Sequence, residues 1–331
     1  NNLADLLRIQ HRFDEAEPLY RRALAIREKA YGTADPRVAT IIHNLALLEQ
    51  DRGNLGHAAA NFKRAAAMQE KALGPEHPEL ATTLNNLGEL YRQQRSYALA
   101  EPLLRRAVAI AERQGPGREG ELAAALNNLG LLYHEQGRYA EAEKLLRRSL
   151  EIRTKHPSVN PTRLAVTLKV LAELYQIQGR YAEAEPLLQR SLDVLSEAHG
   201  DNHPEVADAL ERLAVLHHFQ QQFAEAEPLL LRALAIREKT FGSVHEQVAS
   251  TLDRLAELYR AQNLLAKAEP IYRRLLAVQE QMYGRAHPAV AVTLENLVEV
   301  YQAQKNAAQL QATRARLQQI RAALAARPQR Q

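Results

Sequence analysis

The chain has 331 residues and contains no cysteine, which excludes disulfides, cysteine-based zinc sites and a cysteine nucleophile. No stretch approaches the roughly 20 apolar residues that a transmembrane helix needs. The net charge of +4 arises from residues 305–331, which carry six basic and no acidic residues, so the rest of the chain is slightly acidic. A body with this charge does not favour binding along a nucleic-acid backbone.

Apolar residues recur with a period of 42 along almost the whole chain. One series is Leu3, Leu45, Leu87, Leu129, Leu171, Leu213, Leu255 and Leu297. A second is Phe13, Leu55, Tyr97, Tyr139, Tyr181, Phe223 and Leu265, and a third is Ala16, Ala58, Ala100, Ala142, Ala184, Ala226 and Ala268. Three series in one register, without an insertion, predict a repeat protein. Because the chain opens inside a unit, we expect the first unit to be truncated.

Each unit is predicted to form two helices. In residues 78–113, helix A begins at Pro78 and runs through Tyr91, a polar break follows at 93–96, and helix B runs from about Tyr97 to Arg113. A glycine such as Gly200 follows most helices B and is expected to form a left-handed cap. Prolines at 18, 102, 186, 228 and 270 lie about five residues into helix B, which predicts either a later start or a bend.

Neighbouring units are expected to bury one another's apolar faces in a continuous core. The closest approach is predicted where small residues of helix A face the alanine series of helix B. These small residues are Gly88, Gly130, Ala172, Ala214 and Ala256. Residues 1–304 are thus interpreted as about eight units of 42 residues.

The last part of the chain departs from the repeat. Leu310, Leu317, Ile320 and Leu324 form an apolar stripe that predicts a final helix over 305–326, capping the repeats. Residues 327–331 are expected to be a disordered tail. The alternative is a basic helix that contacts an acidic partner, a membrane or nucleic acid.

Two sequence motifs resemble the tetratricopeptide repeat. They are Leu-Asn-Asn-Leu-Gly-Glu-Leu-Tyr at 84–91 and Tyr-Ala-Glu-Ala-Glu-Pro-Leu-Leu at 181–188. The 42-residue period, Ala-Leu-Ala-Ile-Arg-Glu-Lys at 23–29 and 233–239, and His-Pro-Glu at 77–79 and 203–205 look like the kinesin light chain subtype, in a bacterial member. The unit near Gly120 lacks His-Pro, and the segment 156–161 is irregular. The resemblance implies an all-α, right-handed superhelical solenoid of stacked antiparallel helix pairs.

The resemblance further implies that helices A line a concave groove that binds peptides. Asparagine can pair with a peptide backbone and arginine with a carboxylate. The groove residues predicted on this basis are Asn44, Asn85, Asn86, Arg92, Asn127, Asn128, Lys169, Arg212, Arg254 and Arg260. Alternatively, these side chains are only the solvated edge of helix A. Nearby acids such as Glu173 and Glu211 would partly neutralise the arginines, so preference for an acidic ligand is weakly indicated.

Catalytic and metal-binding patterns are not evident. His77, His203, His245 and His287 recur with the repeat and are interpreted as turn or capping residues, because metal ligands must converge within about 2–2.5 Å of an ion. Tyr91, Tyr133, Tyr175, Tyr259 and Tyr301 occupy one repeat position and are interpreted as packing residues. We therefore predict no catalytic residue, no metal, no cofactor and no small-molecule substrate.

The sequence favours a non-catalytic scaffold that binds proteins or extended peptides, some with acidic residues, in the cytoplasm. The alternative is a structural or regulatory array of a larger multidomain signalling protein that drives self-association. Contact with nucleic acid or a membrane through the basic final helix is a third, less favoured interpretation.

Overall fold

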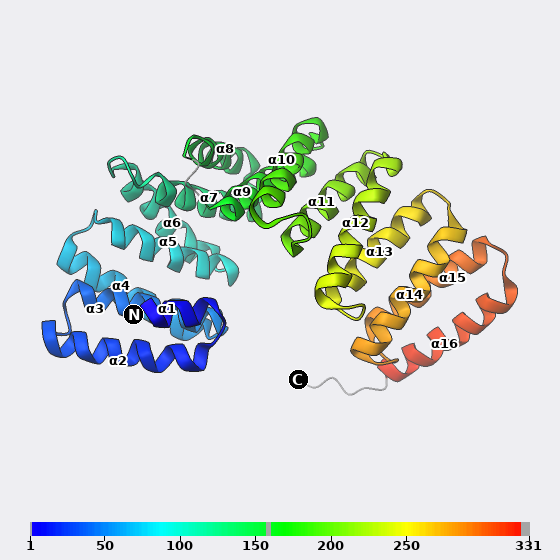
Figure 1. Ribbon diagram of the computed structural model, residues 1–331, viewed down its shortest axis with the longest axis horizontal. Helices are drawn as coiled ribbons and strands as arrows, with labels where there is room; N and C mark the ends of the chain where they lie inside the picture. Colours follow the sequence, from blue (N-terminus) through cyan, green and yellow to red (C-terminus); the bar gives the residue numbers. More distant parts are fainter. Residues whose placement is uncertain (1, 157–159, 326–331) are drawn as a thin grey trace. The chain divides into compact units, whose positions relative to one another are not determined.

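The computed structural model describes residues 2–156 and 160–325, and in this part of the chain it contains helices and no strand (Figure 1). The chain divides into two units, residues 1–160 and 161–331. Within each unit every helix packs against the next one along the chain, so that a helix A is followed by a helix B. The all-α fold of stacked helix pairs predicted from the 42-residue period is confirmed.

Residues 2–155, the described part of unit 1 up to the end of its last helix, form four helix pairs. Their bounds are α1 (Asn2–Ile9), α2 (Phe13–Tyr31), α3 (Pro36–Asp51), α4 (Leu55–Leu73), α5 (Pro78–Gln93), α6 (Tyr97–Glu112), α7 (Glu119–Glu135) and α8 (Tyr139–Lys155). Odd-numbered helices are helices A and even-numbered ones are helices B. The helices expected over 78–113 therefore lie where the apolar periodicity places them.

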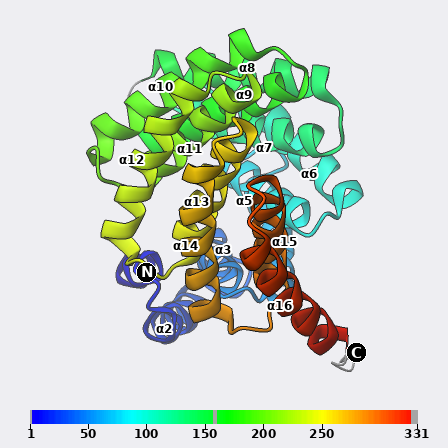
Figure 2. The same cartoon turned by 90° about the vertical axis from the view of Figure 1, so that its right-hand side faces the viewer.

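Four further helix pairs are formed by residues 161–325 of unit 2, which the structure describes. Their bounds are α9 (Pro161–Ile177), α10 (Tyr181–His199), α11 (Pro204–Phe219), α12 (Phe223–Phe241), α13 (Glu246–Ala261), α14 (Leu265–Tyr283), α15 (Pro288–Ala303) and α16 (Ala307–Ala325). The helix α16 takes the place of a helix B and packs along α15 (Figure 2). Its Leu317 and Ile320 are buried, as the predicted apolar stripe requires. The predicted disordered tail lies outside the described residues.

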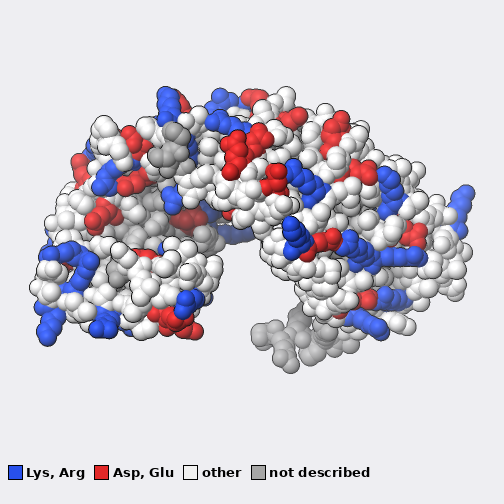
Figure 3. Space-filling model, viewed as in Figure 1, with Lys and Arg blue, Asp and Glu red and all other residues white. Residues whose placement is uncertain are grey.

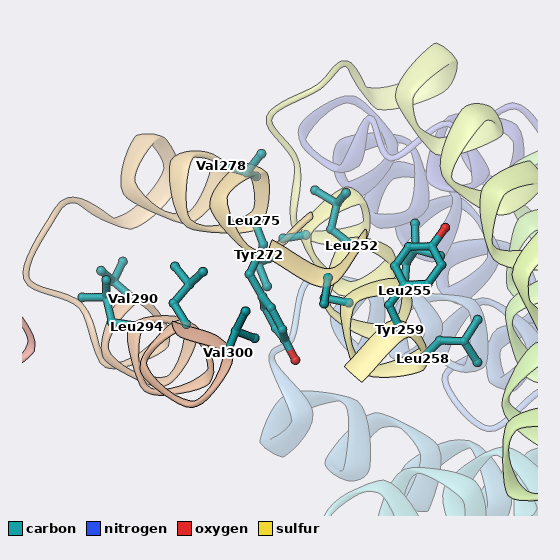
Figure 4. Close-up of a cluster of buried hydrophobic side chains, with 14 of the residues drawn as sticks. Leu252, Leu255, Leu258, Tyr259, Tyr272, Leu275, Val278, Val290, Leu294 and Val300 are labelled. Carbon is teal, nitrogen blue, oxygen red and sulfur yellow. The ribbon is translucent and has the colours of Figure 1, made fainter. Parts of the chain in front are cut away.

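The core of unit 2 follows the repeat register (Figure 4). Leu255 and Leu297, two members of the leucine series, are almost completely buried. Tyr259 and Tyr301 are also buried, which confirms the packing role predicted for the tyrosine series. Each helix pair covers the apolar face of the next one, as in a solenoid.

The small residues of helix A mark the closest approach of the two helices of a pair. A Cβ added at Gly88 would lie 2.6 Å from Cγ of Leu104 and 3.4 Å from the carbonyl oxygen of Ala100. Gly130 has the same relation to Leu146 and Ala142. The predicted close approach is thus present, but the main partner of the small residue is the leucine four residues after the alanine.

We expect Ala184→Leu to lower the free energy of unfolding by about 1–3 kcal/mol, because Ala184 is completely buried at this crossing and a larger side chain would overpack it. Urea denaturation measures the change. Ala182→Leu, at an exposed position of the same helix, is the matched control and should change stability by less than about 0.5 kcal/mol. Equal effects of the two substitutions would contradict the assigned packing.

The recurring histidines cap helices A. Nδ1 of His77, His203, His245 and His287 accepts a hydrogen bond from the backbone N–H two residues later, at 3.2, 3.3, 3.2 and 3.2 Å. Asp35 does the same at the start of α3, at 2.8 Å. Within the described ranges no three histidine or acidic side chains are arranged to hold a metal ion. The predicted capping role is confirmed, and it satisfies a backbone donor that the helix leaves free.

The glycine that follows helix B does not form the left-handed cap expected from the sequence. Gly200 has φ 82° and ψ 156°, an extended conformation with positive φ that is open essentially only to glycine. The positive φ expected of this glycine is therefore present, but its ψ lies outside the left-handed helical region. Positive φ values also occur in the turn between helix A and helix B, where Arg95 has φ 56° and Gly137 has φ 75°.

The prolines of helix B lie inside regular helices. The helix α2 begins at Phe13, although Pro18 is its sixth residue, and α6, α10, α12 and α14 repeat this arrangement. A later start of helix B, one of the two alternatives considered, is therefore wrong. Each proline removes one helical hydrogen bond close to the N-terminal end of its helix.

Candidate binding groove

Three adjoining cavities follow the consecutive helices A of unit 2. Their volumes are 170, 320 and 390 Å³, in order from α9 to α13. The first two share Leu188, Asp208 and Arg212, and the last two share Val215 and Arg254, so the three form one surface, which we call the unit 2 groove. Leu188 and Leu230, from helices B, form part of its floor.

The predicted arginines of unit 2 are held in ion pairs between neighbouring helices. Arg212 of α11 pairs with Glu173 of α9, and Arg254 of α13 pairs with Glu211 of α11. Arg260 lies one turn beyond Glu257, to which it is bonded at 2.7 Å, and it also reaches Glu299 at 3.1 Å. The guanidinium groups therefore join successive repeats to one another.

Lys169 differs from these arginines. It is half-buried on α9 and, among the described residues, no side chain or backbone group forms a hydrogen bond or ion pair with it. Burial, together with the positive charge of Arg212, lowers the pKa of Lys169 although Glu173 and Asp208 lie nearby. Of the ten predicted residues, the structure brings Lys169, Arg212 and Arg254 together as lining of one groove.

The predicted asparagines lie in unit 1, where their amides bond to neighbouring helices. Asn44 donates to Oδ1 of Asp5 at 3.1 Å. Asn128 donates to Oδ1 of Asn85 at 3.1 Å. Asn127 is buried, with 7% of its surface exposed. Arg92 binds both carboxylate oxygens of Glu89, at 2.6 and 2.7 Å, and also pairs with Glu135. These side chains thus already connect the helices A of unit 1.

Asn86 completes a buried network around His43. The imidazole of His43 lies between Thr83 Oγ1, 2.9 Å from Nδ1, and Asn86 Nδ2, 3.3 Å from Nε2. Because the Asn86 amide is a donor, Nε2 accepts and Nδ1 donates to Thr83, which requires a neutral imidazole. Burial, assisted by the charge of Arg8, lowers the pKa of His43 to about 4.

This network predicts a loss of stability in acid. An unfolded histidine takes up a proton below its ordinary pKa of about 6.5, whereas folded His43 stays neutral until about pH 4, so the unfolded state is favoured as the pH falls through this window. We expect a loss on the order of 2 kcal/mol at about pH 5. Urea denaturation at pH 7 and pH 5 measures it. A His43→Gln variant should lack this part of the loss, and an identical loss in both chains would contradict the assignment.

A buried arginine that was not predicted from the sequence lies beneath the unit 2 groove. Arg237 of α12 is 5% exposed and lines the middle cavity. Its guanidinium donates to Asp208 at 2.5 Å and to Thr251 Oγ1 at 2.6 Å, and it pairs with the buried Glu211. Arg237 belongs to a motif used only to recognise the repeat, and nothing local in the sequence indicates that it is buried.

The unit 2 groove therefore combines fixed ion pairs with apolar side chains. Positive and negative side chains are also interspersed over the face seen in Figure 3.

No described helix is both long enough and apolar enough to cross a bilayer.

Comparisons with known proteins identify the family. The tetratricopeptide repeat model matches residues 1–71, 38–113, 97–155, 163–239, 206–281 and 247–316. A search of curated protein sequences gave no match. The solved structure of BtubC (BKLC) from P. vanneervenii is 26% identical, with a TM-score of 0.59 over 72% of this chain and 95% of that chain.

Two further solved structures share the fold. Kinesin light chain TPR-like repeats from Podosopora anserina are 24% identical, with a TM-score of 0.55 over 64% of this chain and 99% of that chain. A signal transduction ATPase with a tetratricopeptide repeat sensor, from Pyrococcus horikoshii, is 16% identical, with a TM-score of 0.71 over 96% of this chain and 46% of that chain. The repeated family match along most of the sequence shows that this chain belongs to the tetratricopeptide repeat family.

Proposed function

We propose that this chain is a non-catalytic scaffold that binds an extended segment of a partner protein in the unit 2 groove. The continuity of the three cavities across α9, α11 and α13 carries the proposal, because a long open groove fits a peptide better than a compact substrate. Membership of a repeat family whose members generally serve as protein-interaction scaffolds supports it.

The proposal extends to the asparagines of unit 1. The hydrogen bonds of Asn86 and Asn128 use their amide nitrogens, and within the described chain no donor reaches their Oδ1 atoms. An amide oxygen of this kind can accept a peptide N–H. In this proposal Asn86 and Asn128 contact the backbone of a peptide bound to unit 1 on its own, and their hydrogen bonds to neighbouring helices hold them in position.

Selection from a phage-displayed library of random peptides tests the proposal. The full chain, immobilised, should enrich peptides that a Val215→Arg variant binds at least about tenfold more weakly, because Val215 is shared by two of the cavities and an arginine there would fill the groove. Leu231→Arg, at an exposed apolar position of α12, is the matched control and should bind normally. Both variants should keep the wild-type helical content by circular dichroism.

Failure to enrich any peptide would refute the proposed function. Equal binding to the wild type and to Val215→Arg would refute the unit 2 groove as the site. Peptides that bind to unit 1 should be weakened severalfold by Asn86→Ala or Asn128→Ala, and unchanged binding of every enriched peptide would exclude those contacts.

The basic helix α16 does not support nucleic-acid binding. Arg316 pairs with Glu280, and Arg321 is bonded to Glu295 at 2.7 Å, so part of its positive charge is already neutralised by α14 and α15. The predicted capping role accounts for these contacts.

A further inference from the structure

We propose that the unit 2 groove recognises a peptide segment carrying both an acidic and a basic side chain, with the acidic group bound by Lys169 and the basic group by Asp253. The inference rests on the proposed function, because it names the charge pattern of the segment that the groove binds. It adds a basic side chain to the acidic residues that the sequence led us to expect in some ligands.

Most of the charged side chains in the unit 2 groove are already paired with neighbouring side chains. Arg212 is paired with Glu173, Arg254 with Glu211, and Arg237 with both Asp208 and Glu211. At the two ends, Glu257 is bonded to Arg260 and to the hydroxyl of Tyr272, and Glu205 accepts a bond from Thr162 and lies 3.3 Å from His199. Among the charged side chains lining the three cavities of the described chain, only Lys169 and Asp253 have neither a hydrogen bond nor an ion pair.

Lys169 lies in the cavity of 170 Å³, whose walls include Ala165, Val166 and Ala209. The nearby acids do not neutralise it, because Glu173 and Asp208 are bound to Arg212 and Arg237. The lowered pKa of Lys169 reflects the same situation, a partly buried ammonium group beside a second cation. A ligand carboxylate would supply the missing counter-charge, while a neighbouring apolar residue could pack on Val166.

Asp253 lies in the cavity of 390 Å³ at the other end of the unit 2 groove, together with Phe219 and Glu257. Partial burial and the neighbouring Glu257 carboxylate raise the pKa of Asp253, and the nearby positive charges of Arg254 and Arg260 only partly oppose this. A ligand lysine or arginine would relieve this repulsion. Phe219 is 61% exposed and offers an aromatic surface beside which the stem of a basic side chain can pack.

The two anchors set a spacing for the ligand charges. Lys169 is on α9 and Asp253 on α13, so they are two repeats apart. With about 10 Å between packed helices, the distance is roughly 20 Å, which an extended peptide spans in about six residues at about 3.3 Å per residue. The segment should therefore carry its acidic and basic side chains about six residues apart.

Charge reversal at each anchor tests the inference with the same random peptide library. The wild-type chain should enrich peptides with one acidic and one basic residue at this spacing. Lys169→Glu should instead enrich peptides with two basic residues, and Asp253→Lys should enrich peptides with two acidic residues. For an individual wild-type-selected peptide, each reversal should weaken binding about fivefold. These changes do not depend on the direction in which the peptide binds.

Lys239→Glu is the matched control, because Lys239 is an exposed lysine on α12 that lines none of the three cavities. It should enrich the same peptides as the wild type. Enrichment of peptides without paired charges, or identical enrichment by the wild type and both reversal variants, would overturn the charge pattern while leaving the proposed function in place. If the wild type enriches no peptide, the proposed function itself fails and the inference fails with it.

Discussion

Replacing Arg237 with alanine should lower the free energy of unfolding by about 3–5 kcal/mol, among the largest effects of any single substitution in this chain. The guanidinium is 5% exposed and connects Asp208, Glu211 and Thr251 of two neighbouring helices A. Its removal leaves the buried Glu211 with Arg254 as its remaining ion-pair partner and Asp208 with none in the described chain. The buried Glu211 then loses one of its two cations, and a cavity replaces the buried guanidinium and its stem; together these cost more than a surface ion pair contributes.

Urea denaturation and amide hydrogen exchange would measure the effect of Arg237→Ala. Exchange should accelerate in α11, α12 and α13 first, because stability in a solenoid is a sum of local and nearest-neighbour terms. Arg232→Ala is the matched control, since Arg232 lies on the same helix, is exposed and forms a 2.9 Å ion pair with Asp201, so a loss below about 1 kcal/mol is expected. A comparable loss in both variants would show that the buried network is not the cause.

A double substitution separates the ion pair from packing. Arg237→Met with Glu211→Leu removes both charges and replaces them with apolar groups of similar size. It should recover part of the stability that Arg237→Ala loses, because an apolar pair avoids the cost of desolvating the charges. If no stability is recovered, Arg237 stabilises the fold mainly through its bonds to Asp208 and Thr251.

Tyr272→Ala should cost about 3–5 kcal/mol, because Tyr272 is completely buried at the centre of the unit 2 core and its removal leaves a large cavity (Figure 4). Its hydroxyl donates to Oε1 of Glu257 at 2.8 Å, and burial together with this bond raises the pKa of Tyr272. Tyr272→Phe keeps the ring and loses only the hydrogen bond, so it should cost about 0.5–1.5 kcal/mol.

The difference between the two Tyr272 variants is the decisive measurement. Urea denaturation of both should show that most of the loss comes from the ring. Equal losses would instead assign the stabilisation to the bond with Glu257. Tyr20 has the equivalent arrangement in unit 1, where its hydroxyl donates to Asp5 at 2.5 Å, so Tyr20→Phe should reproduce the smaller effect.

Much of the fold could be predicted because the relevant information is local and repeated. Apolar residues at helical spacing determine which face of each helix is buried, and the period of 42 places every helix pair in the same register. The histidine caps are likewise local, since each bonds a backbone N–H only two residues away. The sequence also indicated that Leu255 and Tyr259 belong to the core.

The sequence indicated that acids such as Glu173 and Glu211 would partly neutralise the arginines of the candidate site, and the structure confirms this, but the individual pairs could not be predicted. Arg237 bonds to Glu211, 26 residues earlier, Arg212 to Glu173, 39 residues earlier, and Arg254 to Glu211, 43 residues earlier. These offsets depend on how one helix lies against the next and on the rotamers of long side chains, neither of which a local pattern specifies. By itself, the sequence determined the repeat, its helices and its core, whereas only the tertiary structure decided which charges neutralise one another and left Lys169 and Asp253 open to a ligand.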